Sequence, residues 1–178
     1  MVRVAKFTEY NRIFQLIYKQ YLKSGLISEN KSRKHFLHWY FIPFSTIFVN
    51  DELDSTLTSV IDLFSIPAYS IFPEEISEQR KIGRLTEACC LAGQGKNIMK
   101  LIRALARHAR ENKVDQVIIT THPKRVQFYE KIIGFHKFTE EKIHPIYNQP
   151  AVGLVLNFEE VDRNNPPCYQ YIFGNENV

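Results

Sequence analysis

The sequence has few of the features that would narrow its function at once. It has three cysteines in 178 residues, Cys89, Cys90 and Cys168, and no CxxC pair. We therefore expect free thiols in a reducing compartment, not a disulfide framework or a cysteine-ligated metal. The net charge is only +4, too small an excess to indicate nucleic-acid binding. The most apolar stretch, residues 36–49, is interrupted by polar residues and a proline, and it is shorter than the about 20 residues that span a bilayer.

What the sequence does contain is typical of one ordinary globular domain. Hydrophobic residues make up 44% and charged residues 24%, which excludes a disordered chain, and the length fits a single domain. The six histidines have no metal-ligand spacing such as HExxH, so we expect no metal site. The N-terminus has no apolar segment typical of a secretion signal. We expect a cytoplasmic protein without stable membrane insertion and without a nucleic-acid partner.

Hydrophobic periodicity predicts a mixed α/β sheet with helices on its faces. The expected order is β-α-α-β-β-α-β-α-β-α-β-β, in one domain over residues 1–158, followed by a polar, loosely attached tail at 159–178. The unit at 85–121 should be a parallel, right-handed crossover, and the pair before it an antiparallel hairpin. The expected strands are 2–7, 45–49, 55–64, 85–92, 114–121, 135–139 and 151–158, and the expected helices are 8–25, 31–42, 74–80, 97–111 and 123–133.

A glycine-rich turn, Gly93-Gln94-Gly95-Lys96, joins the strand at 85–92 to the helix at 97–111. Such a turn directs free backbone N–H groups and the positive end of the helix dipole toward an anion. It matches neither the Walker A spacing nor GxGxxG, and a simple connection without a ligand fits it equally well. The polar face of the following helix is basic, with Lys96, Lys100, Arg103, Arg107 and Arg110. Such faces are usually just solvated, but this one adjoins the turn.

The segment THPKRVQFYEKIIGF at 121–135 resembles the closing helix and strand of GNAT-superfamily N-acyltransferases. Three further segments are similar to the branch of long-chain N-acyl amino acid synthases: SIPAYSIFPEEISEQR, GRLTEACCLA and IYNQPAVGLVLNF. Together the resemblance covers about residues 2–158. The sequence departs from this branch in its shortened turn, AGQGKN, and in Cys90, where relatives often have a basic residue.

The resemblance implies an N-acyltransferase of the GNAT fold, with no prosthetic group. Acyl-CoA or an acyl carrier protein would donate the acyl group to a small primary amine such as an amino acid, by direct attack in a ternary complex. The turn would bind the pyrophosphate of CoA or the phosphopantetheine arm of the carrier. The residues implied for this role are Ala92, Gly93, Gln94, Gly95, Lys96 and Asn97.

Glu87 and Tyr129 are the candidate catalytic residues. Glu87 lies between apolar residues of its strand, where burial would raise its pKa toward the range of a general base. The alternative is a structural carboxylate satisfied by Arg84 or by a neighbouring strand, and the resemblance favours the catalytic interpretation slightly. Tyr129 matches the family's general acid, and it could equally be a core aromatic. The oxyanion would be bound by a backbone N–H near Cys89 or Cys90, where the strand should bulge.

Two further features leave alternatives open. The adjacent cysteines suggest a thioester intermediate, although neighbouring strand residues should face opposite sides, so at most one would line the site. Aromatic residues around the second helix and the following loop could line an acyl tunnel or be plain core; we assign Trp39, Phe41, Phe64 and Phe72 to the acyl pocket. The rival functions are a short-chain acetyl-CoA-dependent acetyltransferase and a non-catalytic acyl-thioester binding module.

Overall fold

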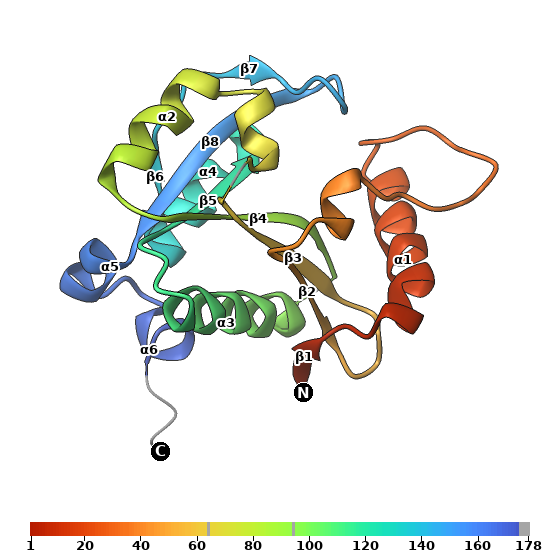
Figure 1. Cartoon of the computed structure of the whole chain (residues 1–178), viewed down its shortest axis with the longest axis horizontal. Helices are drawn as coiled ribbons and strands as arrows, with labels where there is room; N and C mark the ends of the chain where they lie inside the picture. The colour runs from red at the N-terminus through yellow and green to blue at the C-terminus, as the bar shows by residue number, and fades with distance from the viewer. Residues whose placement is uncertain (64, 94, 175–178) are drawn as a thin grey trace.

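The computed structural model describes residues 1–63, 65–93 and 95–174, with the backbone alone at Trp39 (Figure 1). Its central feature is an open eight-stranded sheet in the order β1-β2-β3-β4-β5-β8-β6, with β7 paired to β8. Only β4 and β5 pair in parallel among these neighbours. The strands are β1 (Val2–Val4), β2 (Ser45–Asn50), β3 (Thr56–Ile61), β4 (Leu85–Ala92), β5 (Gln116–Thr121), β6 (His136–Lys137), β7 (Lys142–Ile143) and β8 (Pro150–Asn157).

Helices cover both faces of the sheet. On one face α3 (Lys96–Glu111) lies across the strands, and on the other lie α1 (Tyr10–Lys23) and α2 (Pro73–Ile82) (Figure 1). The apolar residues of α3 recur at helical spacing, and Leu101, Ile102 and Leu105 are buried on the sheet. The remaining helices are α4 (Val126–Phe128), α5 (Phe158–Asn164) and α6 (Tyr169–Ile172), with 3-10 turns at Phe7–Glu9, His38–Phe41, Pro67–Ser70 and Pro123–Arg125 and a π turn at Tyr129–Ile133.

The expected fold class is confirmed. The hairpin of β2 and β3 is antiparallel, and β4, α3 and β5 form the parallel crossover that the sequence predicted. Among the described residues, no helix combines the length and the apolarity needed to cross a membrane.

The prediction of a second helix at 31–42 was wrong. The segment is an irregular loop that ends in the 3-10 turn His38–Phe41. Tertiary contacts explain the difference, because the rings of Phe36 and Phe41 pack against Phe14 of α1 at centroid distances of 5.6 and 5.9 Å. The backbone N–H of His35 also donates to the Phe14 carbonyl at 3.0 Å. These contacts with α1 thus stabilise the irregular loop in place of a helix.

The C-terminal segment is packed on the sheet and α3, where we expected a loosely attached tail. The side chain of Asn157 accepts hydrogen bonds from the N–H groups of Glu159 and Glu160, which starts α5. Phe158, Val161, Ile172 and Phe173 are buried in the same core as α3. The polar composition of the segment did not indicate this packing, because only a few of its side chains are apolar and these few are the buried ones.

The site is positioned by two irregularities at the end of β4. The register passes from Thr58↔Cys89 to Thr56↔Ala92, so one residue of β3 faces two of β4, and Cys90 has a φ of +55°. This is a β-bulge. Pairing between β4 and β5 ends at Ala88↔Ile119, although both strands continue. Beyond that point the two parallel strands separate, and a gap opens in the middle of the sheet.

Candidate active site

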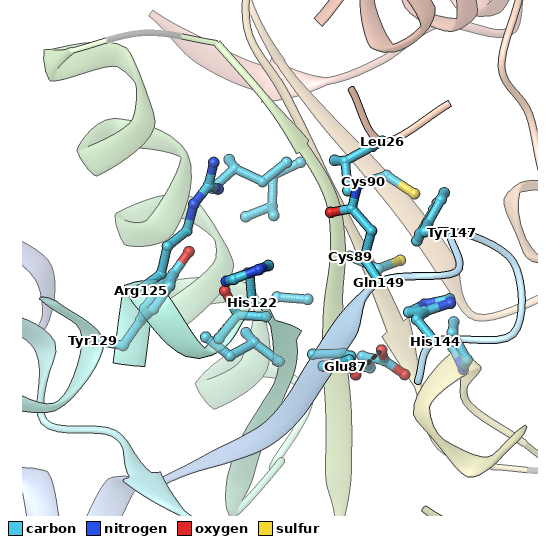
Figure 2. Close-up of a pocket in the computed structure, with 18 of the residues that line it drawn as sticks. Leu26, Glu87, Cys89, Cys90, His122, Arg125, Tyr129, His144, Tyr147 and Gln149 are labelled. Carbon is cyan, nitrogen blue, oxygen red and sulfur yellow. Dashed lines mark hydrogen bonds between the residues drawn. The ribbon is translucent and has the colours of Figure 1, made fainter. Parts of the chain in front are cut away.

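A cavity of about 440 Å³ lies at the gap between β4 and β5, a volume typical of small-molecule sites. It is lined from both faces of the sheet. Figure 2 shows His122, Arg125 and Tyr129 on one side of β4, and Cys89, Tyr147 and His144 on the other. A ligand in this cavity therefore contacts both sides of the sheet.

Glu87 is buried at the gap, with 2% of its surface exposed. The backbone N–H of Ala68 donates to its Oε2 at 2.6 Å, and the Thr120 hydroxyl lies 3.5 Å from its Oε1. Burial raises the pKa of Glu87 to about 8, although these two hydrogen bonds act in the opposite direction. The alternative of a pairing with Arg84 finds no support among the contacts described for this carboxylate, and the Arg84 guanidinium donates to the Asn112 carbonyl instead. Glu87 can therefore exchange a proton near neutral pH.

Tyr129 lines the cavity from the opposite side. Its ring packs edge-on against Phe128 and Phe135, at centroid distances of 5.4 and 5.7 Å. Burial raises the pKa of its hydroxyl, so it stays protonated and can donate a proton. Besides His122 and Arg125, this side carries apolar residues, Leu57, Leu91, Ile102, Leu105, Ile119 and Phe135.

The other side of the cavity has a polar, aromatic lining that we did not predict. Tyr147 packs on His144 at a centroid distance of 4.4 Å, and its hydroxyl lies 3.2 Å from Nε2 of His35. Tyr21 packs edge-on against Tyr147. Nδ1 of His144 accepts a hydrogen bond from the backbone N–H of Ile146, which leaves Nε2 as the protonated nitrogen. Burial lowers the pKa of both histidines, so these rings are neutral near pH 7.

The two cysteines lie on the same face, whereas strand alternation predicted opposite faces. The bulge at Cys90 breaks the alternation, and both side chains line the cavity within the cluster around α1 (Figure 2). The pKa of Cys89 is raised by its hydrogen bond with Cys90 and by burial. Because the thiolate is the nucleophile, this environment disfavours a thioester intermediate on Cys89. The bulge also keeps the backbone of residues 89–91 beside the cavity.

The turn after β4 has the backbone needed for a close approach to a ligand. Gly93 and Gly95 have φ values of +143° and +54°, which favour glycine. A Cβ at Gly93 would lie 2.6 Å from the Ser55 hydroxyl. Ala92 ends β4, Lys96 begins α3, and the Asn97 amide donates to Asp54 at 3.3 Å. Gln94 lies outside the described residues.

Two of the four residues assigned to the acyl pocket have side chains that the structure describes, and both lie away from the cavity. Phe41 is 55% exposed and packs among aromatic rings near α1, and Phe72 is fully buried beneath α2. Neither lines the cavity. Phe64 and the side chain of Trp39 lie outside the described residues.

Comparison with solved structures shows the same fold in N-acyltransferases. The structure of FeeM, an N-acyl amino acid synthase from uncultured soil microbes, matches with a TM-score of 0.81 and 22% identity over 96% of this chain and 98% of that one. The CoA-dependent acyl-homoserine lactone synthase MesI matches with a TM-score of 0.68, 10% identity and coverages of 100% and 97%. The aminoglycoside acetyltransferase AAC(6')-Ib in complex with coenzyme A matches with a TM-score of 0.62, 16% identity and coverages of 93% and 98%. A comparison with curated protein sequences returns no match.

The fold and the site define this protein as an N-acyltransferase enzyme of the GNAT type. The family model described as N-acyl amino acid synthase FeeM matches residues 12–157. The chain therefore belongs to the FeeM family of N-acyl amino acid synthases.

Proposed function

We propose that this enzyme transfers an acyl group longer than acetyl from a phosphopantetheine thioester to a primary amine such as an amino acid. The observation that carries this proposal is the cavity through the sheet, with Glu87 and Tyr129 on opposite sides of it. The amine and the thioester can then approach each other from the two faces and react at the gap. Family membership supports the same reaction class.

The chemistry follows from the positions of the side chains. The amine nitrogen attacks the thioester carbonyl carbon, a C–N bond forms and the C–S bond breaks. Glu87 accepts the proton that the amine loses, directly or through a water molecule, and Tyr129 donates a proton to the departing sulfur. The backbone N–H groups at the bulge of Cys89 and Cys90 bind the carbonyl oxygen as it becomes negative. The high pKa of Tyr129 suits a proton donor, and the pKa of Glu87 near 8 suits a base.

The apolar side of the cavity would take the acyl chain. Ile102 and Leu105 of α3 face Leu57, Leu91 and Ile119 of the sheet across this space. An acetyl group needs no such chamber, whereas a medium or long chain gains about 0.8 kcal/mol for each buried methylene group. The opposite side, with Tyr21, His144 and Tyr147, would take the amine acceptor.

The donor would be acyl-CoA or an acyl carrier protein. The glycine turn at Gly93 and Gly95 and the start of α3 would bind its phosphates, and Lys96 and Lys100 lie exposed on the first two turns of that helix. Of the structural neighbours, MesI is a CoA-dependent synthase, and AAC(6')-Ib was solved in complex with coenzyme A. A basic helix face also suits an acidic carrier protein.

The test is acyl-chain profiling of the purified enzyme with donors from acetyl to palmitoyl, as CoA and as carrier-protein thioesters. We expect turnover to rise with chain length, and Leu105→Phe to reduce it for long chains while leaving acetyl turnover unchanged. Turnover confined to acetyl-CoA would establish a short-chain acetyltransferase instead. Binding of CoA without transfer to any amine would establish a non-catalytic module.

A further inference from the structure

Aromatic side chains form an exposed ridge beside the N-terminal end of α1. We define the aromatic ridge as Phe7, Tyr10, Phe41 and Phe36, whose rings follow one another in that order at centroid distances of 5.2, 6.2 and 6.4 Å. Phe7 is 77% exposed, and Phe36 and Phe41 are each 55% exposed. Single exposed phenylalanines are ordinary, but a contiguous group of them indicates a binding surface.

The ridge is held in place from below. The buried ring of Phe14 contacts Tyr10, Phe36 and Phe41 at centroid distances of 5.6 to 5.9 Å. The hydrogen bond from His35 to the Phe14 carbonyl fixes the loop that carries Phe36. The outward rings therefore rest on the core, and the fold maintains their contact with solvent.

The same part of the chain is basic. Residues 6–41 contain seven Lys and Arg and two Glu, a net charge of +5, whereas the whole chain has +4. Lys6 adjoins Phe7, and Lys31, Arg33 and Lys34 precede Phe36. Glu9 is paired with Arg3 at 2.7 Å. Cations thus flank the aromatic ridge at both ends in the sequence.

We propose that the aromatic ridge and its flanking cations bind the surface of an anionic lipid bilayer. A bilayer supplies both complements at one surface, with anionic headgroups for Lys and Arg and a shallow apolar layer for the rings. A contiguous group of exposed rings, with cations on either side of it in the sequence, matches this arrangement. The contact is peripheral and reversible.

A second, mostly apolar cavity is lined by the segment that follows the ridge in the sequence. It has a volume of about 340 Å³ and is lined by Ile42, Pro43 and Phe44 from the segment after the ridge, with Ile66 and Tyr69 opposite. Pro67 lines both this cavity and the active-site cavity. If a bilayer at the ridge extends over this second cavity, an amphiphilic substrate or product of the proposed reaction could exchange with lipid there. This consequence rests on the proposed function, but lipid binding itself does not.

Vesicle sedimentation of the full chain tests the proposal, with no acyl donor or acceptor present. We expect binding to vesicles of equal parts phosphatidylglycerol and phosphatidylcholine, weakened by salt, and little binding to phosphatidylcholine alone. Lys31→Glu/Lys34→Glu should lower the partition coefficient at least about tenfold, and Phe7→Ser/Phe36→Ser about tenfold. Ile82→Ser and Lys131→Glu change exposed side chains elsewhere and should leave binding unchanged.

Circular dichroism of each variant must match the unmodified protein, so that lost binding is not lost folding. No binding to anionic vesicles, or equal binding to neutral ones, overturns the proposal. Binding reduced equally by the ridge variants and by the two controls also overturns it. If vesicles do not bind but the ridge variants weaken binding of an acyl carrier protein, the ridge is a protein interface and the lipid proposal is wrong. Chain-length profiling with soluble donors tests the enzyme activity separately.

Discussion

Replacing Glu87 by Gln gives a prediction about stability as well as activity. The pKa of Glu87 is about 8 in the folded protein against 4.5 for an unperturbed side chain. Between these pH values the folded protein holds a proton that the unfolded chain releases. Stability should therefore be fully present below pH about 4.5 and should fall as the pH rises toward 8. A difference of about 3.5 pKa units corresponds to about 5 kcal/mol at most.

Gln cannot ionise, so Glu87→Gln should remove this slope. The amide oxygen can still accept the hydrogen bond from Ala68, and the amide N–H can donate to the Thr120 hydroxyl. We expect the variant to equal the unmodified protein near pH 5 and to exceed its stability by several kcal/mol at pH 9. Urea unfolding at intervals from pH 5 to 9 measures this difference. Glu78→Gln, at an exposed ion pair, is the matched control and should change stability by less than about 1 kcal/mol.

The same variant should lose activity, because Gln cannot accept a proton from the amine. We expect kcat to fall by about 10²- to 10⁴-fold, and the rate of the unmodified enzyme to rise with pH through about 8 as Glu87 ionises. Thr120→Val removes a hydrogen bond that lowers the pKa of Glu87, so it should move this rise to higher pH. A stability difference independent of pH would refute the assigned ionisation. Full activity in Glu87→Gln would refute the assigned base.

Three further predictions concern the remaining parts of the site. Tyr129→Phe should lower kcat by at least about tenfold with little change in KM, in a steady-state assay; an unchanged kcat would exclude it as the proton donor. Cys89→Ala and Cys90→Ala should each retain transfer, and mass spectrometry should detect no acyl-enzyme; loss of transfer together with an acyl adduct in the unmodified enzyme would support the thioester route. Gly93→Ala should cost about 1–3 kcal/mol in urea unfolding and weaken CoA binding, because of its positive φ and its crowded Cβ position. Gly25→Ala has a positive φ without crowding and should cost less, and equal losses would exclude the close contact as the cause.

The local sequence pattern was sufficient to predict β4, α3 and β5, which form one half of the site. The β-branched run of β5 and the apolar stripe of α3 predict the parallel crossover, and the crossover places Glu87 in the middle of a buried strand. A carboxylate there has few partners, and its raised pKa follows mainly from burial. The glycine turn could be located for the same reason, since glycine and helix periodicity are local signals.

The other half of the site has no local signal. Tyr21 lies in the last turn of α1, and His144 and Tyr147 belong to the connection between β7 and β8. These residues meet only through tertiary packing. The unevenly spaced aromatics of 31–41 fit a helix as well as a loop, and contacts with Phe14 decide between them. The acyl pocket was assigned to aromatics by residue type, whereas the part of the cavity that we propose for the acyl chain has aliphatic residues such as Ile102, Leu105 and Ile119.

One backbone irregularity connects the two halves. Without the bulge at Cys90, strand alternation would point one thiol to each face, and the backbone after Cys89 would keep its regular register with β3. With the bulge, β4 bends away as its pairing with β5 ends at Ala88↔Ile119. The bend opens the sheet without exposing Glu87, which lies three residues before Cys90. Glu87 stays buried and still accepts the hydrogen bond from the backbone N–H of Ala68. The cavity can therefore cross the sheet beside a carboxylate that keeps its raised pKa, which is the combination that proton abstraction from an amine requires.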